Sequence, residues 1–109
     1  LRGSWFSLVG LNAVRAVSEM FVDKAFIGVD GIHAEHGFTS HYPDEAAVNQ
    51  AMVAHARQKI VVAQHEKIGQ IAQTLICPTP AIDLLITDSG ANDEAAAAFT
   101  SRGVQVQRV

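Results

Sequence analysis

The sequence predicts an α/β fold, a mostly parallel sheet with flanking helices. Three short apolar runs, at 24–29, 60–63 and 82–87, have the length and composition of buried strands. Segments with helical spacing separate the strands, and this alternation is typical of βαβ units. The length of 109 residues suits one small domain with its own hydrophobic core. We therefore expect a single α/β unit.

The first half of the chain contains the clearest signals. Apolar residues at three-residue steps predict a helix over 10–20, and the strand at 24–29 is expected to be buried on both faces. The polar segment 33–42 predicts a loop. Pro43 suits the first position of a helix, which the apolar stripe extends to about Gln58.

The second half continues the alternation. A short strand at 60–63 is followed by the ambiguous stretch 69–76, which fits either a helix or an extended segment before Pro78. A third strand at 82–87 precedes a helix that Asn92 caps and Gly103 ends. The alternating residues that follow Gly103 predict a half-exposed final strand.

Composition excludes several functional classes. The net charge is −3 and Lys and Arg do not cluster, so this chain by itself is not expected to bind DNA or RNA. No apolar run approaches the ~20 residues that cross a bilayer, so no membrane association is expected. The single cysteine, Cys77, excludes an internal disulfide and indicates a reducing, cytoplasmic setting.

Polar residues follow the predicted strands, and three of them form the candidate site. Asp30 ends the first strand, Lys67 follows the second, and Glu45 opens the helix between them. The carboxyl ends of parallel strands share one edge, where ligands of α/β proteins bind. A lysine and a helix N-terminus suit an anion, and carboxylates suit hydroxyl groups. The simpler interpretations are that Glu45 complements the helix dipole and that Lys67 is a solvated loop charge.

Other residue patterns give no site of their own. His33, Glu35, His36 and His41 are possible zinc ligands, but their spacing matches no closed structural site, so no metal or cofactor is expected. Cys77 has no Cys/His arrangement around it and is expected to be buried and inert.

Several motifs together resemble the DeoR family of bacterial sugar-responsive repressors, and the resemblance covers essentially the whole chain. They are Asp23-Lys-Ala-Phe-Ile-Gly-Val-Asp-Gly-Ile32, Gly37-Phe-Thr39, Asp44-Glu-Ala46, Ile60-Val-Val-Ala63 with Lys67 and Gly69, and Ile82-Asp-Leu-Leu-Ile-Thr-Asp88.

The resemblance implies that residues 1–109 are the C-terminal part of the family's effector-sensing domain, which is similar in fold to ribose-5-phosphate isomerase. The helix-turn-helix and the first half of the sensing domain would lie outside this chain. DNA would then be bound only through the missing N-terminal domain, and the protein would form a homo-oligomer.

The resemblance also implies a ligand-binding set. Asp30, Glu45 and Lys67 match functional positions of the family, and Gly31, Gly37 and Thr39 lie in the same motifs. A phosphorylated sugar or a derivative would be the effector. The sequence departs from the family at residues 64–66, Gln-His-Glu, where Asp-Ser-Ser is usual.

The alternative is a sugar-phosphate isomerase with Glu45 as its base. His33 stands where isomerases have a second acidic residue, and the loop 34–37 lacks their further lysine. These departures favour binding without turnover, so no enzyme is expected. A third possibility is an oligomerisation module that binds no ligand.

Overall fold

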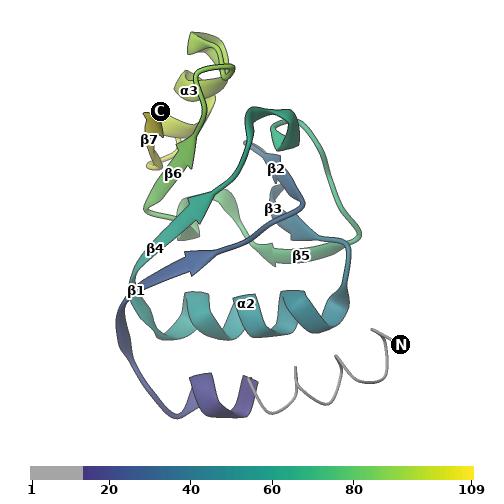
Figure 1. Ribbon diagram of the computed structural model, residues 1–109, viewed down its shortest axis with the longest axis vertical. Coiled ribbons are helices and arrows are strands. Elements are labelled where there is room, and N and C mark those ends of the chain that lie inside the picture. The colour runs from purple at the N-terminus through teal and green to yellow at the C-terminus, as the bar shows by residue number, and fades with distance from the viewer. Residues whose placement is uncertain (1–13) are drawn as a thin grey trace.

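The computed structural model describes residues 14–109, in which strands and helices alternate (Figure 1). Residues 14–18 are helical and precede the first strand. The elements in order are β1 (Val22–Ile27), β2 (Gly31–His33), β3 (Gly37–Ser40), α2 (Pro43–His55), β4 (Ala56–Val62), the 3-10 helix η1 (His65–Lys67), β5 (Thr74–Cys77), the 3-10 helix η2 (Thr79–Ala81), β6 (Leu84–Thr87), α3 (Asp93–Thr100) and β7 (Gln105–Arg108).

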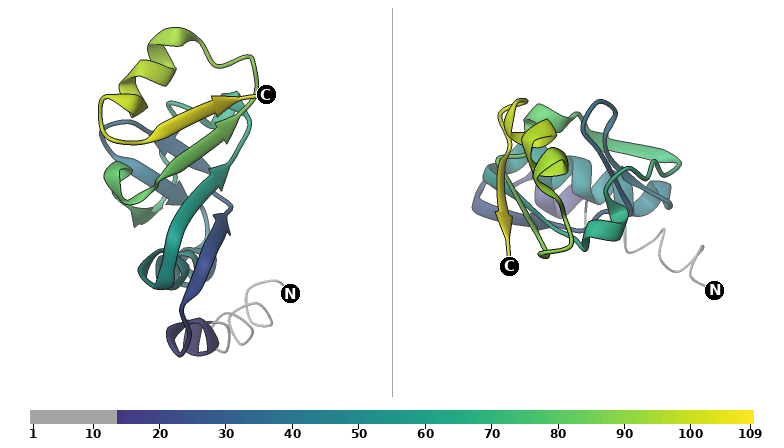
Figure 2. Two further views of the ribbon diagram at one scale, coloured as in Figure 1. Left: turned by 90° about the vertical axis from the view of Figure 1, so that its left-hand side faces the viewer. Right: turned by 90° about the horizontal axis from the view of Figure 1, so that it is seen from above.

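Four of the strands form one parallel sheet in the order β1-β4-β6-β7 (Figure 2). Ile27 is paired with Val61, and Val61 is paired in turn with Leu85, so these side chains share one face. Parallel strands need crossover connections, and helices α2 and α3 lie in two of them. The predicted α/β fold with a mostly parallel sheet is confirmed.

A second, three-stranded antiparallel sheet has the order β2-β3-β5. The prediction of a loop over 33–42 is therefore wrong, because this segment contains the turn and second strand of a hairpin. All four residues of β3 are buried, so no alternation of exposed and buried positions marks them as a strand. The ambiguous stretch 69–76 becomes extended from Thr74, where β5 pairs with β3.

Helix α2 begins at Pro43 as predicted, with Asp44 and Glu45 in its first turn. Its predicted end near Gln58 is wrong, because the helix ends at His55 and the chain continues directly as β4. Residues 56–59 pair with β1 and therefore take the extended conformation. No glycine or proline marks the transition from helix to strand.

Helix α3 confirms the predicted cap. The Asn92 side-chain oxygen accepts a hydrogen bond from the Ala95 N–H at 2.8 Å, which satisfies one free donor of the first turn. The helix ends at Thr100, and Gly103 then turns the chain with a φ of +88°. Phe99 of α3 is buried and packs with its ring 6.3 Å from that of Phe38.

The two faces of the parallel sheet differ in burial. Ile27, Val61 and Leu85 are at most 2% exposed and belong to the main core, which α2 and the antiparallel sheet help to cover. On the opposite face Phe26 is 62% exposed and Val62 is 53% exposed. The prediction that the strand at 24–29 is buried on both faces is therefore wrong for β1. We call the side of the sheet that carries Phe26 and Val62 the open face.

The expected helix over 10–20 is described only in part, as helical residues 14–18. Residues 10–13 of this predicted helix lie outside the described residues. Within 14–109, no helix is both long enough and apolar enough to cross a membrane.

Candidate functional site

The candidate site lies where β1, β4 and β6 end. These strands are parallel neighbours, so their carboxyl ends reach one rim of the sheet. Asp30 follows β1, Lys67 belongs to η1 after β4, and Asp88 follows β6. The predicted convergence of the three strand ends is therefore present in the structure.

Asp30 is held as an acceptor at this rim. Its Oδ2 accepts hydrogen bonds from the His41 backbone N–H at 2.8 Å and from the Ser40 hydroxyl at 3.3 Å. The hydrogen bond from the His41 N–H lowers the pKa of Asp30 below its usual value, although partial burial opposes the shift. The positive charge of Lys67 also lowers this pKa, which places Lys67 within electrostatic range of Asp30.

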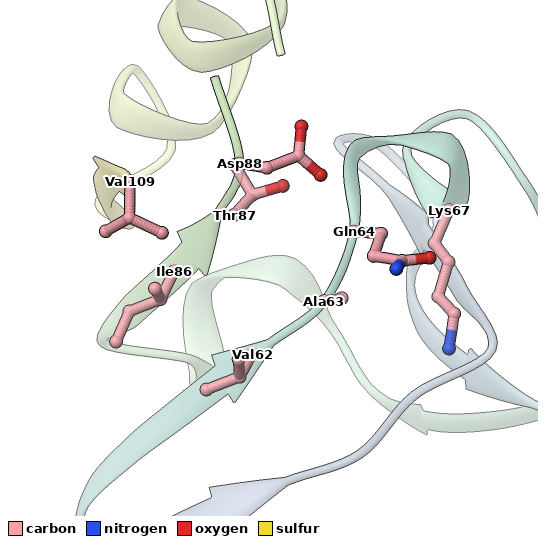
Figure 3. Close-up of a pocket in the computed structure, with 8 residues that line it drawn as sticks. All are labelled: Val62, Ala63, Gln64, Lys67, Ile86, Thr87, Asp88 and Val109. Carbon is pink, nitrogen blue, oxygen red and sulfur yellow. The ribbon is translucent and has the colours of Figure 1, made fainter. Parts of the chain in front are cut away.

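Lys67 is held next to Asp30 and also borders a cavity over the ends of β4 and β6. Its ammonium donates a hydrogen bond to the Val29 carbonyl oxygen at 2.8 Å, next to Asp30 in the chain. The same side chain lines a cavity of about 340 Å³ (Figure 3). The other lining residues are Val62, Ala63, Gln64, Ile86, Thr87, Asp88 and Val109. The Lys67 ammonium is therefore held at the end of β1, while the residue also borders the cavity.

Glu45 is located by its helix. It lies in the first turn of α2, one turn before Asn49, whose side-chain amide donates to the Gly28 carbonyl oxygen at 2.9 Å. Residues four apart share a helix face, so Glu45 lies on the face of α2 turned to the end of β1. The structure thus brings the first turn of α2 to the region of Asp30.

The other three residues of the predicted set have packing roles. A Cβ at Gly31 would lie 2.5 Å from the Thr39 hydroxyl oxygen, and that oxygen accepts the Ala72 N–H at 2.8 Å. Gly37 has a φ of +93°, and a Cβ there would collide with the Cys77 carbonyl oxygen. These contacts give Gly31, Gly37 and Thr39 a packing role in the antiparallel sheet. Their role in ligand binding stays a prediction.

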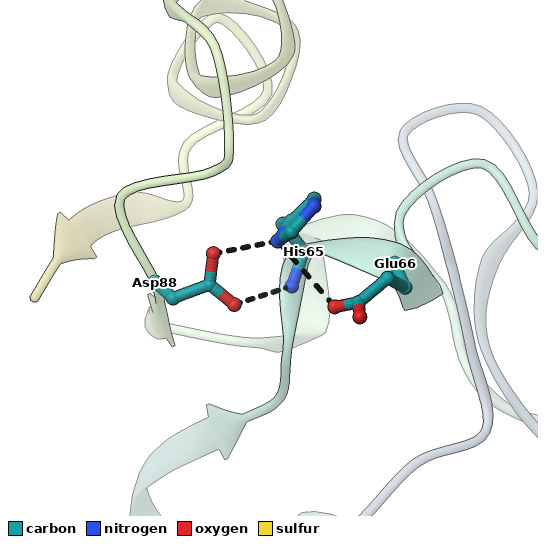
Figure 4. Close-up of side chains that lie close together, drawn as sticks. All are labelled: His65, Glu66 and Asp88. Carbon is teal, nitrogen blue, oxygen red and sulfur yellow. Dashed lines mark hydrogen bonds and ion pairs between the residues drawn. The ribbon is translucent and has the colours of Figure 1, made fainter.

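Two residues of the rim were not in the predicted binding set. The Asp88 carboxylate accepts the His65 backbone N–H at 2.9 Å, and its other oxygen lies 2.6 Å from His65 Nδ1 (Figure 4). The hydrogen bond from the His65 backbone lowers the pKa of Asp88. Sequence position placed both residues after strands, but nothing in the sequence indicates that residues 23 apart are paired.

The histidine loop and the cysteine have other surroundings. His33 Nδ1 accepts the backbone N–H groups of Glu35 and His36, each at 3.2 Å, so this nitrogen stabilises its own turn. Cys77 is 4% exposed, and burial raises the pKa of its thiol to about 11. The expectation of a buried thiol is confirmed, and the raised pKa makes it unreactive near neutrality.

The chemistry of this rim suits binding. An ammonium group can bind an anion, and a carboxylate that is ionised at neutral pH can accept hydrogen bonds from hydroxyl groups. A general base works best when its pKa lies near the working pH. The lowered pKa of Asp30 therefore suits a permanent acceptor better than a proton carrier.

Comparisons with known proteins show which proteins this chain is similar to. The family model described as the DeoR C terminal sensor domain matches residues 1–89. The HTH-type transcriptional repressor GlcR of Bacillus subtilis is 35% identical over 91% of this chain and 38% of its own length. The putative aga operon transcriptional repressor of Escherichia coli O157:H7 is 32% identical over 97% of this chain and 39% of its own. The HTH-type transcriptional regulator GlpR of Haloferax volcanii is 30% identical over 97% of this chain and 42% of its own. The chain thus spans about two fifths of the length of these relatives.

Proposed function

This chain belongs to the DeoR C-terminal sensor domain family, and on that premise we propose that it is the C-terminal part of the effector-sensing domain of a transcriptional regulator. The effector is a phosphorylated sugar or a derivative, bound at the rim of the parallel sheet. Lys67 binds the anionic group, and Asp30 and Glu45 accept hydrogen bonds from hydroxyl groups. Gly31, Gly37 and Thr39 complete the predicted set by shaping the neighbouring sheet.

One observation supports this proposal most directly. Asp30 and Lys67 are 37 positions apart in the sequence, yet the Lys67 ammonium binds the carbonyl oxygen of the residue next to Asp30. An ammonium and an ionised carboxylate held at the same rim can bind a ligand that carries both an anion and hydroxyl groups.

The open face supports the proposal that a further part of a longer protein completes the domain. Phe26 and Val62 expose apolar surface there, and such surface usually marks a contact with another element. The relatives named above are more than twice as long as this chain. In our proposal a preceding segment covers the open face, and DNA is bound through a separate N-terminal domain. The full-length protein is a cytoplasmic homo-oligomer.

A thermal-shift screen of sugar phosphates against the full-length regulator tests this function. Binding raises the melting temperature in proportion to the logarithm of ligand concentration above the Kd. Lys67→Ala removes a charge-assisted hydrogen bond and is expected to weaken the affinity about tenfold or more. Arg102→Ala, an exposed cation just before β7 at the other end of the sheet from the rim, is the matched control and is expected to bind as the parent does. Equal affinities of the Lys67 variant and the parent would contradict the assigned role of Lys67.

The second candidate is the isomerase, favoured only by the position of Glu45 near Asp30. Incubating the full-length protein with aldose phosphates and measuring ketose formation distinguishes the two functions. We expect no turnover. Ketose formation that Glu45→Gln abolishes would replace the sensor function by the enzymatic one.

A further inference from the structure

We propose that His65, Glu66 and Asp88 form a binding site for a divalent transition-metal ion such as Mn²⁺ or Zn²⁺. The three residues come from the two loops that follow the neighbouring parallel strands β4 and β6. One ligand atom of each residue lies within 4.8 Å of the other two. Imidazole nitrogen and carboxylate oxygen are the ligands that these ions take in proteins.

The geometry brings two carboxylates to one ring nitrogen (Figure 4). His65 Nδ1 lies 2.6 Å from Asp88 Oδ1 and 3.4 Å from Glu66 Oε1. This nitrogen carries at most one proton, so it can donate a full hydrogen bond to only one of the two carboxylates. A metal ion in place of that proton would be bound by both carboxylates and by the nitrogen.

The charge balance at the cluster also favours a cation. Among residues 14–109, neither Glu66 nor Asp88 forms an ion pair with a lysine or an arginine. The neighbouring Lys67 turns away, because its ammonium binds the Val29 carbonyl oxygen. Two negative charges therefore face one imidazole, and a divalent ion would neutralise them.

Two of the three ligands, His65 and Asp88, are held in place by contacts that a metal ion would leave intact. The backbone N–H of His65 donates to Asp88 Oδ2 at 2.9 Å, and the N–H of Gly90 donates to Asp88 Oδ1 at 2.8 Å. A Cβ at Gly90 would collide with the His65 ring, so the ring packs closely over this turn. Little side-chain freedom remains to be lost at His65 and Asp88 when an ion binds.

Ion binding requires one local rearrangement. With metal–ligand distances of about 2.0–2.2 Å, two ligand atoms stand about 3 Å apart or more, so the 2.6 Å hydrogen bond between His65 and Asp88 has to open. The Nδ1 proton moves to solvent, and a proton from solvent on Nε2 keeps the imidazole neutral. No net charge transfer or redox step is involved.

Titration of the metal-free chain with MnCl₂ and with ZnCl₂ tests this proposal, with MgCl₂ as a comparison. We expect a rise in melting temperature and a stoichiometry of one ion per chain by calorimetry, with Mg²⁺ at least tenfold weaker because it prefers oxygen ligands. Glu66→Gln changes an exposed side chain with little risk to folding, and it is expected to weaken Mn²⁺ binding at least tenfold. His65→Ala is expected to abolish it.

His36→Ala and Glu35→Gln are the matched controls, since both side chains are exposed in another loop. Both controls are expected to bind metal as the parent does. Co²⁺ gives a second readout, because its visible absorption changes when protein ligands replace coordinated water. No melting shift with any ion, unchanged affinity in Glu66→Gln, or loss of binding in His36→Ala would each overturn the proposal and leave His65–Asp88 as a hydrogen bond between two loops.

Discussion

Replacing Phe26 by alanine tests whether the open face is an interior surface of a longer protein. Phe26 is 62% exposed in this chain, so less than half of its surface is buried. Replacing it by alanine can therefore remove only the stabilisation that comes from this buried part. Full burial of a phenylalanine contributes about 1.5–3 kcal/mol, and the buried part here therefore contributes about 1 kcal/mol. Where another segment covers the ring, Phe→Ala substitutions cost about 3–5 kcal/mol, because a cavity is added to the lost transfer energy.

The assay is urea unfolding of Phe26→Ala in this chain and in the full-length protein. We expect the free energy of unfolding to fall by about 1 kcal/mol in the first and by about 3–5 kcal/mol in the second. Phe38→Ala is the control, because Phe38 is 0% exposed in the described core and is expected to lose about 3–5 kcal/mol in both proteins. Equal losses for Phe26→Ala in the two proteins would refute the idea that the open face is covered.

Three further substitutions test the backbone and the rim. Gly37→Ala is expected to lower the free energy of unfolding, measured by urea titration, by about 2 kcal/mol or more, because its φ of +93° and the nearby Cys77 carbonyl oxygen both oppose a Cβ. Gly103→Ala is expected to lower it by only about 1 kcal/mol, because Gly103 has a φ of +88° but no atom near the place of a Cβ. Asp30 has a pKa in the folded state below its usual 3.8, so its stabilisation is complete above pH 3.8 and is lost as the pH falls through the lower folded value. Melting curves of Asp30→Asn and the parent are therefore expected to differ at neutral pH and to converge in strong acid, and a constant difference at all pH values would contradict this role.

The parallel sheet and the helix starts could be predicted from sequence because local signals mark them. The apolar runs of β1, β4 and β6 stand out against polar flanks, and Pro43 and Asn92 mark helix starts by their own chemistry. Each of these elements can be predicted from the residues of one short segment alone. The structure confirms these elements, although β1 ends at Ile27 rather than at residue 29 and β4 begins at Ala56 rather than at residue 60.

The antiparallel sheet could not be predicted, because its strands are defined by pairing with segments that are distant in the sequence. Strand β3 is fully buried although it includes Thr39 and Ser40, and its partner β5 begins 34 residues after Ser40. The Thr39 hydroxyl is satisfied by the backbone of Ala72, which only the folded chain brings near. Likewise, the change from α2 to β4 after His55 is imposed by pairing with β1.

The candidate site likewise contains residues that could be predicted from sequence and residues that could not. Asp30 and Lys67 could be assigned to the rim because each follows a recognisable strand, and parallel strands end at one edge. The contact between His65 and Asp88 could not, because it depends on how two loops approach each other. Residues 64–66, where the sequence departs from the family pattern, provide two of the three ligands of the proposed metal site.

The short helix η1 separates the two proposed sites, and this makes them independently testable. Lys67 extends from η1 toward the end of β1, where it binds the Val29 carbonyl oxygen, whereas His65 extends toward the end of β6, where it contacts Asp88. Lys67→Ala should therefore weaken effector binding and leave metal binding unchanged, and Glu66→Gln should do the reverse. If either substitution abolished both, the cause would be a displaced η1, because the backbone of this helix is the element that both sites share.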